Sequence, residues 1–159
     1  MALEIERKFL VINDNWKKNI IKTERMVQGY LGGNKQSSVR IRIYGEHADI
    51  NIKANVIGSQ RLEYEYPVSL ADAEEMLKQL CDKPLIEKYR HHVEVGNHTW
   101  EVDEFEGENA GLIIAEIELD VIEESFDLPA WIGEEVTDDS RYYNIFLVSN
   151  PFSGWQKIN

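Results

Sequence analysis

The chain has 159 residues, of which 43% are hydrophobic and 29% charged, a composition typical of a globular protein with one domain over residues 1–159. Its net charge of −12 argues against nucleic acid as a partner, because binding to a phosphate backbone needs a basic surface. No apolar run approaches the roughly 20 residues of a membrane span. The single cysteine, Cys81, excludes an internal disulfide and is expected to be buried on a helix. We therefore expect a cytoplasmic protein with no membrane partner.

The first segment, residues 3–11, alternates apolar and charged residues, which is the period of a β-strand rather than of a helix. One face of this strand carries Glu4, Glu6 and Lys8, and the other face is mainly apolar. Taken alone, an edge strand whose charged face points to water explains the segment equally well. The strands that follow repeat the same pattern.

Further elements follow in chain order. A turn and a short helical piece are expected from residue 13. Strands are predicted at residues 26–31, 37–44, 48–54, 60–68, 85–95, 99–105 and 112–121. Because tight turns join most of them, the sheet should be antiparallel. Residues 69–81 change to helical spacing, with Ser69 as the N-cap. The tail from residue 122 loses the period of two, and we expect one or two short helices there that cover an end or flank of the sheet.

The charged residues inside these strands share one face of the sheet. The basic positions are Lys8, Arg40, Arg42, Lys53, Arg61, Lys88 and Arg90. The acidic positions are Glu4, Glu6, Glu63, Glu65, Asp103, Glu116 and Glu118. A solvent-exposed face normally mixes Ser, Thr, Gln and Asn with its charges. We therefore interpret this face as the lumen of a closed barrel, with the apolar faces outside, beneath the helices and the tail.

Such a lumen needs ligands, because buried charges are costly unless they are compensated. Clustered cations need an anion, and clustered carboxylates need a cation between them to stay ionised. One ligand pair meets both needs: a polyanion such as a triphosphate, and a hard divalent metal such as Mg²⁺ or Mn²⁺ on the glutamates. Arg and Lys at alternating positions offer a row of donors, with Arg suited to bidentate phosphate contacts.

At this point the chain resembles a known family. Glu4-Ile5-Glu6-Arg7-Lys8 is similar to the ExExK signature of the CYTH superfamily, the triphosphate tunnel metalloenzymes. The similarity extends through the basic and acidic pairs given above and through residues 133–144, and so covers nearly the whole chain. The resemblance implies an α+β fold: a mainly antiparallel, closed β-barrel of about eight strands that forms a tunnel, with helices packed outside.

The resemblance also implies roles for individual residues. The polyphosphate would bind to Lys8, Arg40, Arg42, Lys53, Arg61, Lys88 and Arg90. The metal ligands would be Glu4, Glu6, Glu116 and Glu118. Second choices, as ligands or as partners of the basic residues, are Glu63, Glu65 and Asp103. The catalytic residues would be Lys8, Glu6 and Glu116.

The leading functional hypothesis is metal-dependent hydrolysis of the terminal phosphate of a small triphosphate, most simply inorganic tripolyphosphate. The same tunnel would suit a class IV adenylyl cyclase, which makes cyclic AMP and pyrophosphate from ATP, or a thiamine triphosphatase. A non-catalytic polyphosphate-binding module is a further alternative, but it leaves the glutamates unexplained. The resemblance also leaves a homodimer open.

Overall fold

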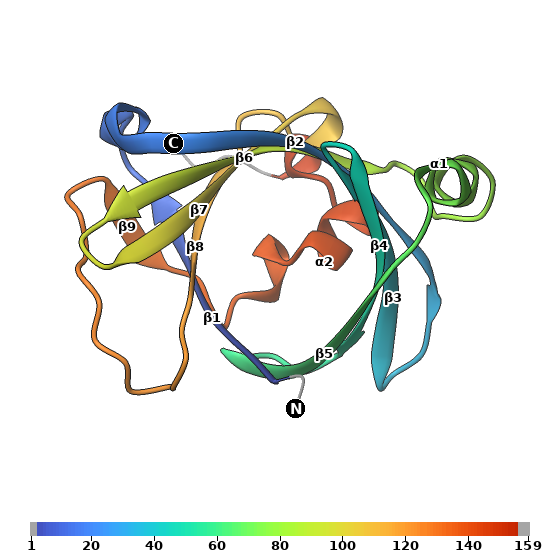
Figure 1. The fold of residues 1–159 in the computed structure, drawn as a ribbon, viewed down its shortest axis with the longest axis horizontal. Helices are drawn as coiled ribbons and strands as arrows, with labels where there is room; N and C mark the ends of the chain where they lie inside the picture. The colour runs from blue at the N-terminus through green and yellow to red at the C-terminus, as the bar shows by residue number, and fades with distance from the viewer. Residues whose placement is uncertain (1–2, 156–159) are drawn as a thin grey trace.

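A computed structural model describes residues 3–155 of the chain. In this part of the chain nine strands form one antiparallel sheet in the order β5-β4-β3-β2-β6-β7-β8-β1-β9, and a further pairing between β5 and β1 closes the first eight into a barrel (Figure 1). The strands are β1 (Leu3–Val11), β2 (Ile20–Gly33), β3 (Ser37–Tyr44), β4 (His47–Ala54), β5 (Gln60–Pro67), β6 (Ile86–Val95), β7 (His98–Phe105), β8 (Ile113–Glu118) and β9 (Ile132–Glu135). The predicted closed antiparallel barrel is confirmed.

Two strand predictions are wrong in extent. β2 begins at Ile20 rather than at residue 26, because its first part is a polar stretch without alternation that is fixed by pairing with β6. β8 ends at Glu118 rather than at residue 121. β9 was not predicted: its four residues carry no repeating pattern, and only pairing with the distant β1 defines them.

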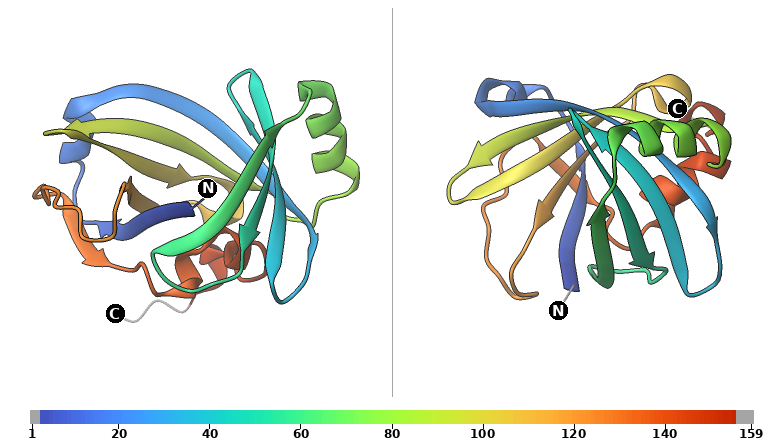
Figure 2. Two further views of the ribbon diagram at one scale, coloured as in Figure 1. Left: turned by 60° about the horizontal axis from the view of Figure 1, so that its bottom comes forward. Right: turned by 45° about the vertical axis from the view of Figure 1, so that its right-hand side comes forward.

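The two long helices occupy different places (Figure 2). α1 (Leu70–Gln79) begins as predicted at Ser69, whose Oγ accepts a hydrogen bond from the Asp72 N–H at 3.1 Å. It lies outside the barrel and packs Ala73 and Leu77 against Ile41 of β3. Cys81 is buried in the same cluster, as expected, but it lies two residues beyond the end of α1 rather than on the helix.

α2 (Asn144–Ser149), in the tail, lies across one end of the barrel rather than outside it, and Figure 1 shows it within the outline of the ring. Its Leu147 is buried with Ile86 and Phe105, which lie two residues from the predicted inward positions Lys88 and Asp103. Since residues two apart on a strand share a face, this part of the inner face is apolar. Within residues 3–155 there are four 3₁₀ segments: Asn15–Asn19, Gly107–Asn109, Ser140–Tyr142 and Phe152–Gly154.

The outer apolar faces are covered unevenly. On the side of β1, β7 and β8, the rings of Phe9, Trp16, Trp100 and Trp131 form a buried cluster. On β4 and β5, however, several large apolar side chains remain exposed: Ile52, Leu62, Tyr64 and Tyr66. The expectation that helices and tail cover every apolar face is therefore wrong for β4 and β5. Among residues 3–155, no helix has the length and apolarity that crossing a membrane requires.

Candidate active site in the barrel lumen

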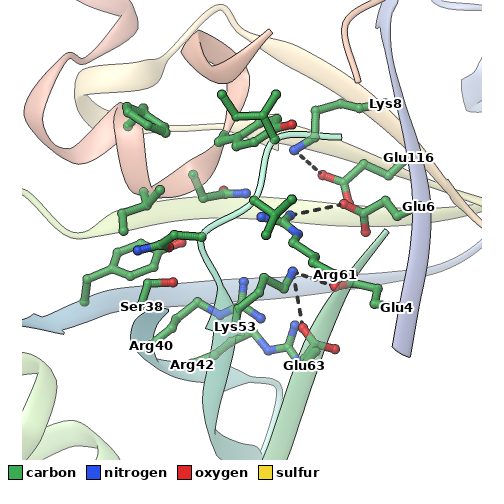
Figure 3. A pocket seen from close by; sticks show the side chains of 18 of the residues that line it. Glu4, Glu6, Lys8, Ser38, Arg40, Arg42, Lys53, Arg61, Glu63 and Glu116 are labelled. Atoms are coloured by element: carbon green, nitrogen blue, oxygen red, sulfur yellow. Dashed lines mark ion pairs between the residues drawn. The ribbon is translucent and has the colours of Figure 1, made fainter. Parts of the chain in front are cut away.

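The lumen of the barrel holds a cavity of about 620 Å³ (Figure 3). Side chains of β1, of its neighbours β5 and β8, and of strands across the barrel line it. Its charged lining residues are Glu4, Glu6, Lys8, Arg40, Arg42, Lys53, Arg61, Glu63, Glu65, Arg90, Glu101, Glu116 and Glu118. The structure thus brings together twelve of the fourteen predicted positions, all except Lys88 and Asp103. The alternating charged face does point inward.

The register of β1 sets which groups meet. β1 pairs with β5 at its beginning and with β8 further on, which places Glu4 opposite Arg61 and Lys8 opposite Glu116. Directly opposite residues of antiparallel strands point to the same face. Glu6 in turn lies opposite Glu118, so two carboxylates face each other in the middle of the lumen.

Acids and bases are interleaved around the lumen. Lys8 Nζ lies 3.1 Å from Glu116 Oε1. Lys53 Nζ lies 2.9 Å from Glu4 Oε2 and 3.2 Å from Glu63 Oε2 (Figure 3). The sequence led us to expect a cluster of cations without carboxylate partners. Most of these cations instead form ion pairs, because side chains of opposite charge on different strands meet in the lumen. A polyanion and a metal would have to exchange partners with these pairs rather than fill a site of one sign.

Arg40 differs from the other lumen cations. Within the described residues it forms no ion pair with a carboxylate, and its Nε contacts only the Asn51 Oδ1, at 3.4 Å. The residue is only 9% exposed. A buried guanidinium without an anion is costly. Its surroundings are therefore suited to an anionic ligand.

The pKa values of Glu4, Glu6 and Glu116 are shifted in different directions. Burial, then the charges of Glu116 and Glu4, raises the pKa of Glu6 well above its ordinary value. Burial also raises the pKa of Glu116, but Lys8 and Arg90 outweigh it and hold that pKa well below the usual range. Lys53 likewise outweighs burial at Glu4, whose pKa is lowered. Glu6 is thus the hardest of these three carboxyls to ionise, because it is buried and lies near the negative charges of Glu116 and Glu4.

This group of carboxylates has the right chemistry for a hard divalent cation, since a cation between them would favour the ionised form of Glu6. In residues 3–155, however, no three acidic, histidine or cysteine side chains already converge on one metal position. The ion pairs with Lys8 and Lys53 explain this, because they draw Glu116 and Glu4 toward the cations.

Asp103 and Lys88 lie behind the cavity wall. Asp103 is fully buried and accepts from Lys88 Nζ at 2.7 Å and from Arg90 Nε and Nη2 at 2.8 and 2.9 Å. Both its oxygens are thus occupied by cations, which makes it a counter-ion in this structure. Lys88 also donates to Asn144 Oδ1 at 3.1 Å. Burial lowers the pKa of Lys88 to about 8, although Asp103 acts against this shift.

Several lining residues were missed by the sequence reasoning. Glu101 lies on the same face of β7 as Asp103 and pairs with Arg90 at 2.5 Å. The period of two places it on that face, but the predicted site did not include it. Tyr143 and the residues of α2 also line the cavity, but they come from the tail, where no alternation marks an inward face.

The comparison with known protein families agrees with this geometry. The CYTH domain matches residues 2–149. The chain belongs to the CYTH domain family. The predicted membership of the CYTH superfamily is thereby confirmed.

Among curated relatives of this CYTH chain, an inorganic triphosphatase of Acetivibrio thermocellus is 45% identical over 157 residues, which is 99% of this chain and 100% of the relative. An inorganic triphosphatase of Nitrosomonas europaea is 32% identical over 145 residues, 89% of this chain and 93% of the relative. The crystal structure of the inorganic triphosphatase NE1496 superposes with a TM-score of 0.68 at 29% identity and covers 93% of this chain and 95% of its own.

Proposed function

We propose that this CYTH protein hydrolyses the terminal phosphate of a small triphosphate, and that inorganic tripolyphosphate is its main substrate. The observation that carries the proposal is the barrel lumen, where the buried Arg40, which has no ion pair within the described residues, lines the same cavity as Glu4, Glu6 and Glu116. The curated names of the relatives, inorganic triphosphatase, support the same substrate.

In this proposal the lumen cations bind and orient the phosphate chain. The contributing residues are Lys8, Arg40, Arg42, Lys53, Arg61 and Arg90, which line the cavity. Lys88 lies behind them and acts through Asn144 and Asp103 rather than by direct contact. Fixed cations stabilise the negative charge that gathers on the phosphoryl oxygens as the bond to the leaving pyrophosphate breaks.

The residues that would hold Mg²⁺ or Mn²⁺ are Glu4, Glu6, Glu116 and Glu118, with Glu63 and Glu65 near the same space. A bound divalent ion supplies Lewis-acid stabilisation of the phosphoryl oxygens. Glu116, whose pKa is lowered by Lys8 and Arg90 despite burial, would orient the attacking water, and Lys8 would contact the phosphate. Water then attacks the terminal phosphorus in line, and the products are orthophosphate and pyrophosphate.

Product analysis tests this proposal. The purified chain is incubated with tripolyphosphate, ATP or thiamine triphosphate, with Mg²⁺ or Mn²⁺ or with excess EDTA. We expect orthophosphate and pyrophosphate from tripolyphosphate, with faster turnover than for ATP, and loss of turnover in EDTA. Cyclic AMP from ATP would instead indicate a cyclase. Full turnover in EDTA would contradict the metal role of the glutamates.

We also propose that the protein works in the cytoplasm as a homodimer. The support for association is the exposed apolar face on β4 and β5, where Tyr66 is 54% and Leu62 47% exposed. Large exposed apolar patches are typical of interaction sites. Sedimentation should show a dimer that Leu62→Lys dissociates, and a monomeric wild type would contradict this part of the proposal.

A further inference from the structure

Tyr143 is buried beside the lumen although it belongs to the irregular tail, immediately before α2. It is only 5% exposed and it lines the cavity. Lys8 Nζ lies 5.3 Å from the centre of its ring, and Arg61 Cζ lies 5.2 Å from it. One aromatic ring therefore contacts two cations that come from neighbouring strands, β1 and β5.

Arg61 has little else to hold it. In residues 3–155 its guanidinium makes no hydrogen bond to another side chain, and its one ion pair, with Glu6 Oε1, is 4.0 Å long. Lys8 has Glu116 at 3.1 Å and the Tyr142 carbonyl at 3.5 Å. Beside the long ion pair with Glu6, the ring face of Tyr143 is a second partner of Arg61, and cation–π attraction is stronger in desolvated sites.

The hydroxyl of Tyr143 fixes the ring in place. It donates to the Thr137 carbonyl at 2.5 Å and accepts from the Gly58 N–H at 3.1 Å. Gly58 has a φ of +131°, which favours glycine, and it belongs to the β4–β5 connection. Thr137 Oγ1 in turn accepts from the backbone N–H of Lys8 at 3.0 Å. The ring is therefore tied both to the strand that carries Lys8 and to the connection that leads into β5.

We infer that Tyr143 is a positioning residue that holds Lys8 and Arg61 in place for the phosphate chain. Long Lys and Arg side chains lose conformational freedom when they bind an anion, and prior ordering removes part of that cost. The ring orders these side chains without adding a negative charge. A carboxylate in its place would neutralise a cation that the phosphate chain needs. The inference rests on the proposed function, since it assigns Tyr143 to the binding of the same substrate.

The test compares Tyr143→Leu, which removes the ring, with Tyr143→Phe, which keeps the ring and removes the hydroxyl. Loss of the ring should raise KM for tripolyphosphate about tenfold and change kcat less than about threefold. Tyr143→Phe keeps the ring face but loses both hydrogen bonds of the hydroxyl, so its KM should rise clearly less than that of Tyr143→Leu. Tyr143→Met replaces the leucine variant if that variant fails to fold. Matched controls are Tyr89→Leu and Tyr89→Phe, because Tyr89 is exposed on β6 and does not line the cavity.

A double-mutant cycle with Arg61→Ala measures the coupling between Tyr143 and Arg61 in the KM for tripolyphosphate. A purely structural role of Tyr143 would give no such coupling. If the ring acts through Arg61, the two changes together should raise KM by clearly less than the product of their separate effects. An unchanged KM in Tyr143→Leu, or a phenylalanine variant as impaired as the leucine one, would overturn the inference. If the wild type neither binds nor hydrolyses tripolyphosphate, the proposed function falls, and this inference with it.

Discussion

Replacing Asp103 by Asn should strongly destabilise the protein. Asp103 is fully buried and is the shared counter-ion of Lys88 and Arg90, at 2.7 and 2.8 Å. Asn keeps the shape of the side chain but removes the charge, so Lys88 loses its carboxylate partner and Arg90 keeps only Glu101 and the more distant Glu116. Breaking a buried ion pair from one side costs about 3–5 kcal/mol.

That loss converts into a large thermal shift. For a chain of this size each kcal/mol moves Tm by about 2–4 °C, so Asp103→Asn should lower Tm by about 6–20 °C. Asp120→Asn is the matched control, because Asp120 is exposed, and its Tm should stay within about 2 °C of wild type. Scanning calorimetry of the apo protein at pH 7 measures both.

A second change separates the electrostatic explanation from simple misfit. Lys88→Met in the Asp103→Asn background removes one of the uncompensated cations and should recover part of the lost stability. If Asp103→Asn has the Tm of the wild type, or if Lys88→Met lowers the Tm of Asp103→Asn further, the assignment of Asp103 as a buried counter-ion is wrong. A metal ligand would instead change the metal dependence of turnover and leave the apo Tm intact.

The ion pairs of Asp103 with Lys88 and Arg90 also predict how the stability depends on pH. Burial raises the pKa of Asp103, but Arg90 and Lys88 outweigh it, and the pKa in the folded state is lowered below the ordinary 3.8. The folded state therefore binds fewer protons than the unfolded state, so the stabilisation is present above pH 3.8 and is lost as the pH falls through the lower folded value. The Tm difference between wild type and Asp103→Asn should shrink in that acidic range. A constant difference would contradict the ion-pair origin.

The remaining predictions concern the lumen. Glu6→Gln should lower kcat by about a hundredfold or more, yet its apo Tm at pH 7 should equal or exceed that of the wild type. The reason is that burial raises the pKa of Glu6 in the folded state, so its ionisation destabilises the fold increasingly as the pH rises above 4.5. A lower Tm would contradict this. Arg40→Ala should raise KM for tripolyphosphate about ten- to hundredfold, since a charged hydrogen bond contributes about 1.5–3 kcal/mol; an unchanged KM would remove Arg40 from the binding site. Tripolyphosphate with Ca²⁺, at about 100 times Kd, should raise Tm by about 5–10 °C, and no shift would argue against binding in the lumen.

The sequence could predict which side chains point inward, because the period of two fixes the face of each strand. Glu4, Glu6 and Lys8 on β1, and Glu116 and Glu118 on β8, were found in this way and do line the cavity. Periodicity carries no information about depth along the barrel. It therefore could not show that Lys88 and Asp103 do not line the cavity, and that Lys88 contacts the lining residue Asn144 instead.

Other features depend on contacts between distant segments. The ion pairs between Lys53 and Glu4, or Lys8 and Glu116, follow from strand register, which the local sequence does not specify. The role of Tyr143 could not be predicted, because its position results from hydrogen bonds to Gly58 and Thr137 in two other segments. The tail gave no pattern from which to infer an inward-facing side chain.

Hydrolysis of tripolyphosphate in ¹⁸O-labelled water, with Mg²⁺ or Mn²⁺, tests the central claim most directly. If the lumen cations present the terminal phosphorus to water, the label should enter orthophosphate, and pyrophosphate should remain unlabelled. Glu116→Gln should abolish both the turnover and the labelling. Label in pyrophosphate would mean attack at the central phosphorus, and no release of phosphate would mean that the tunnel is not a triphosphatase site.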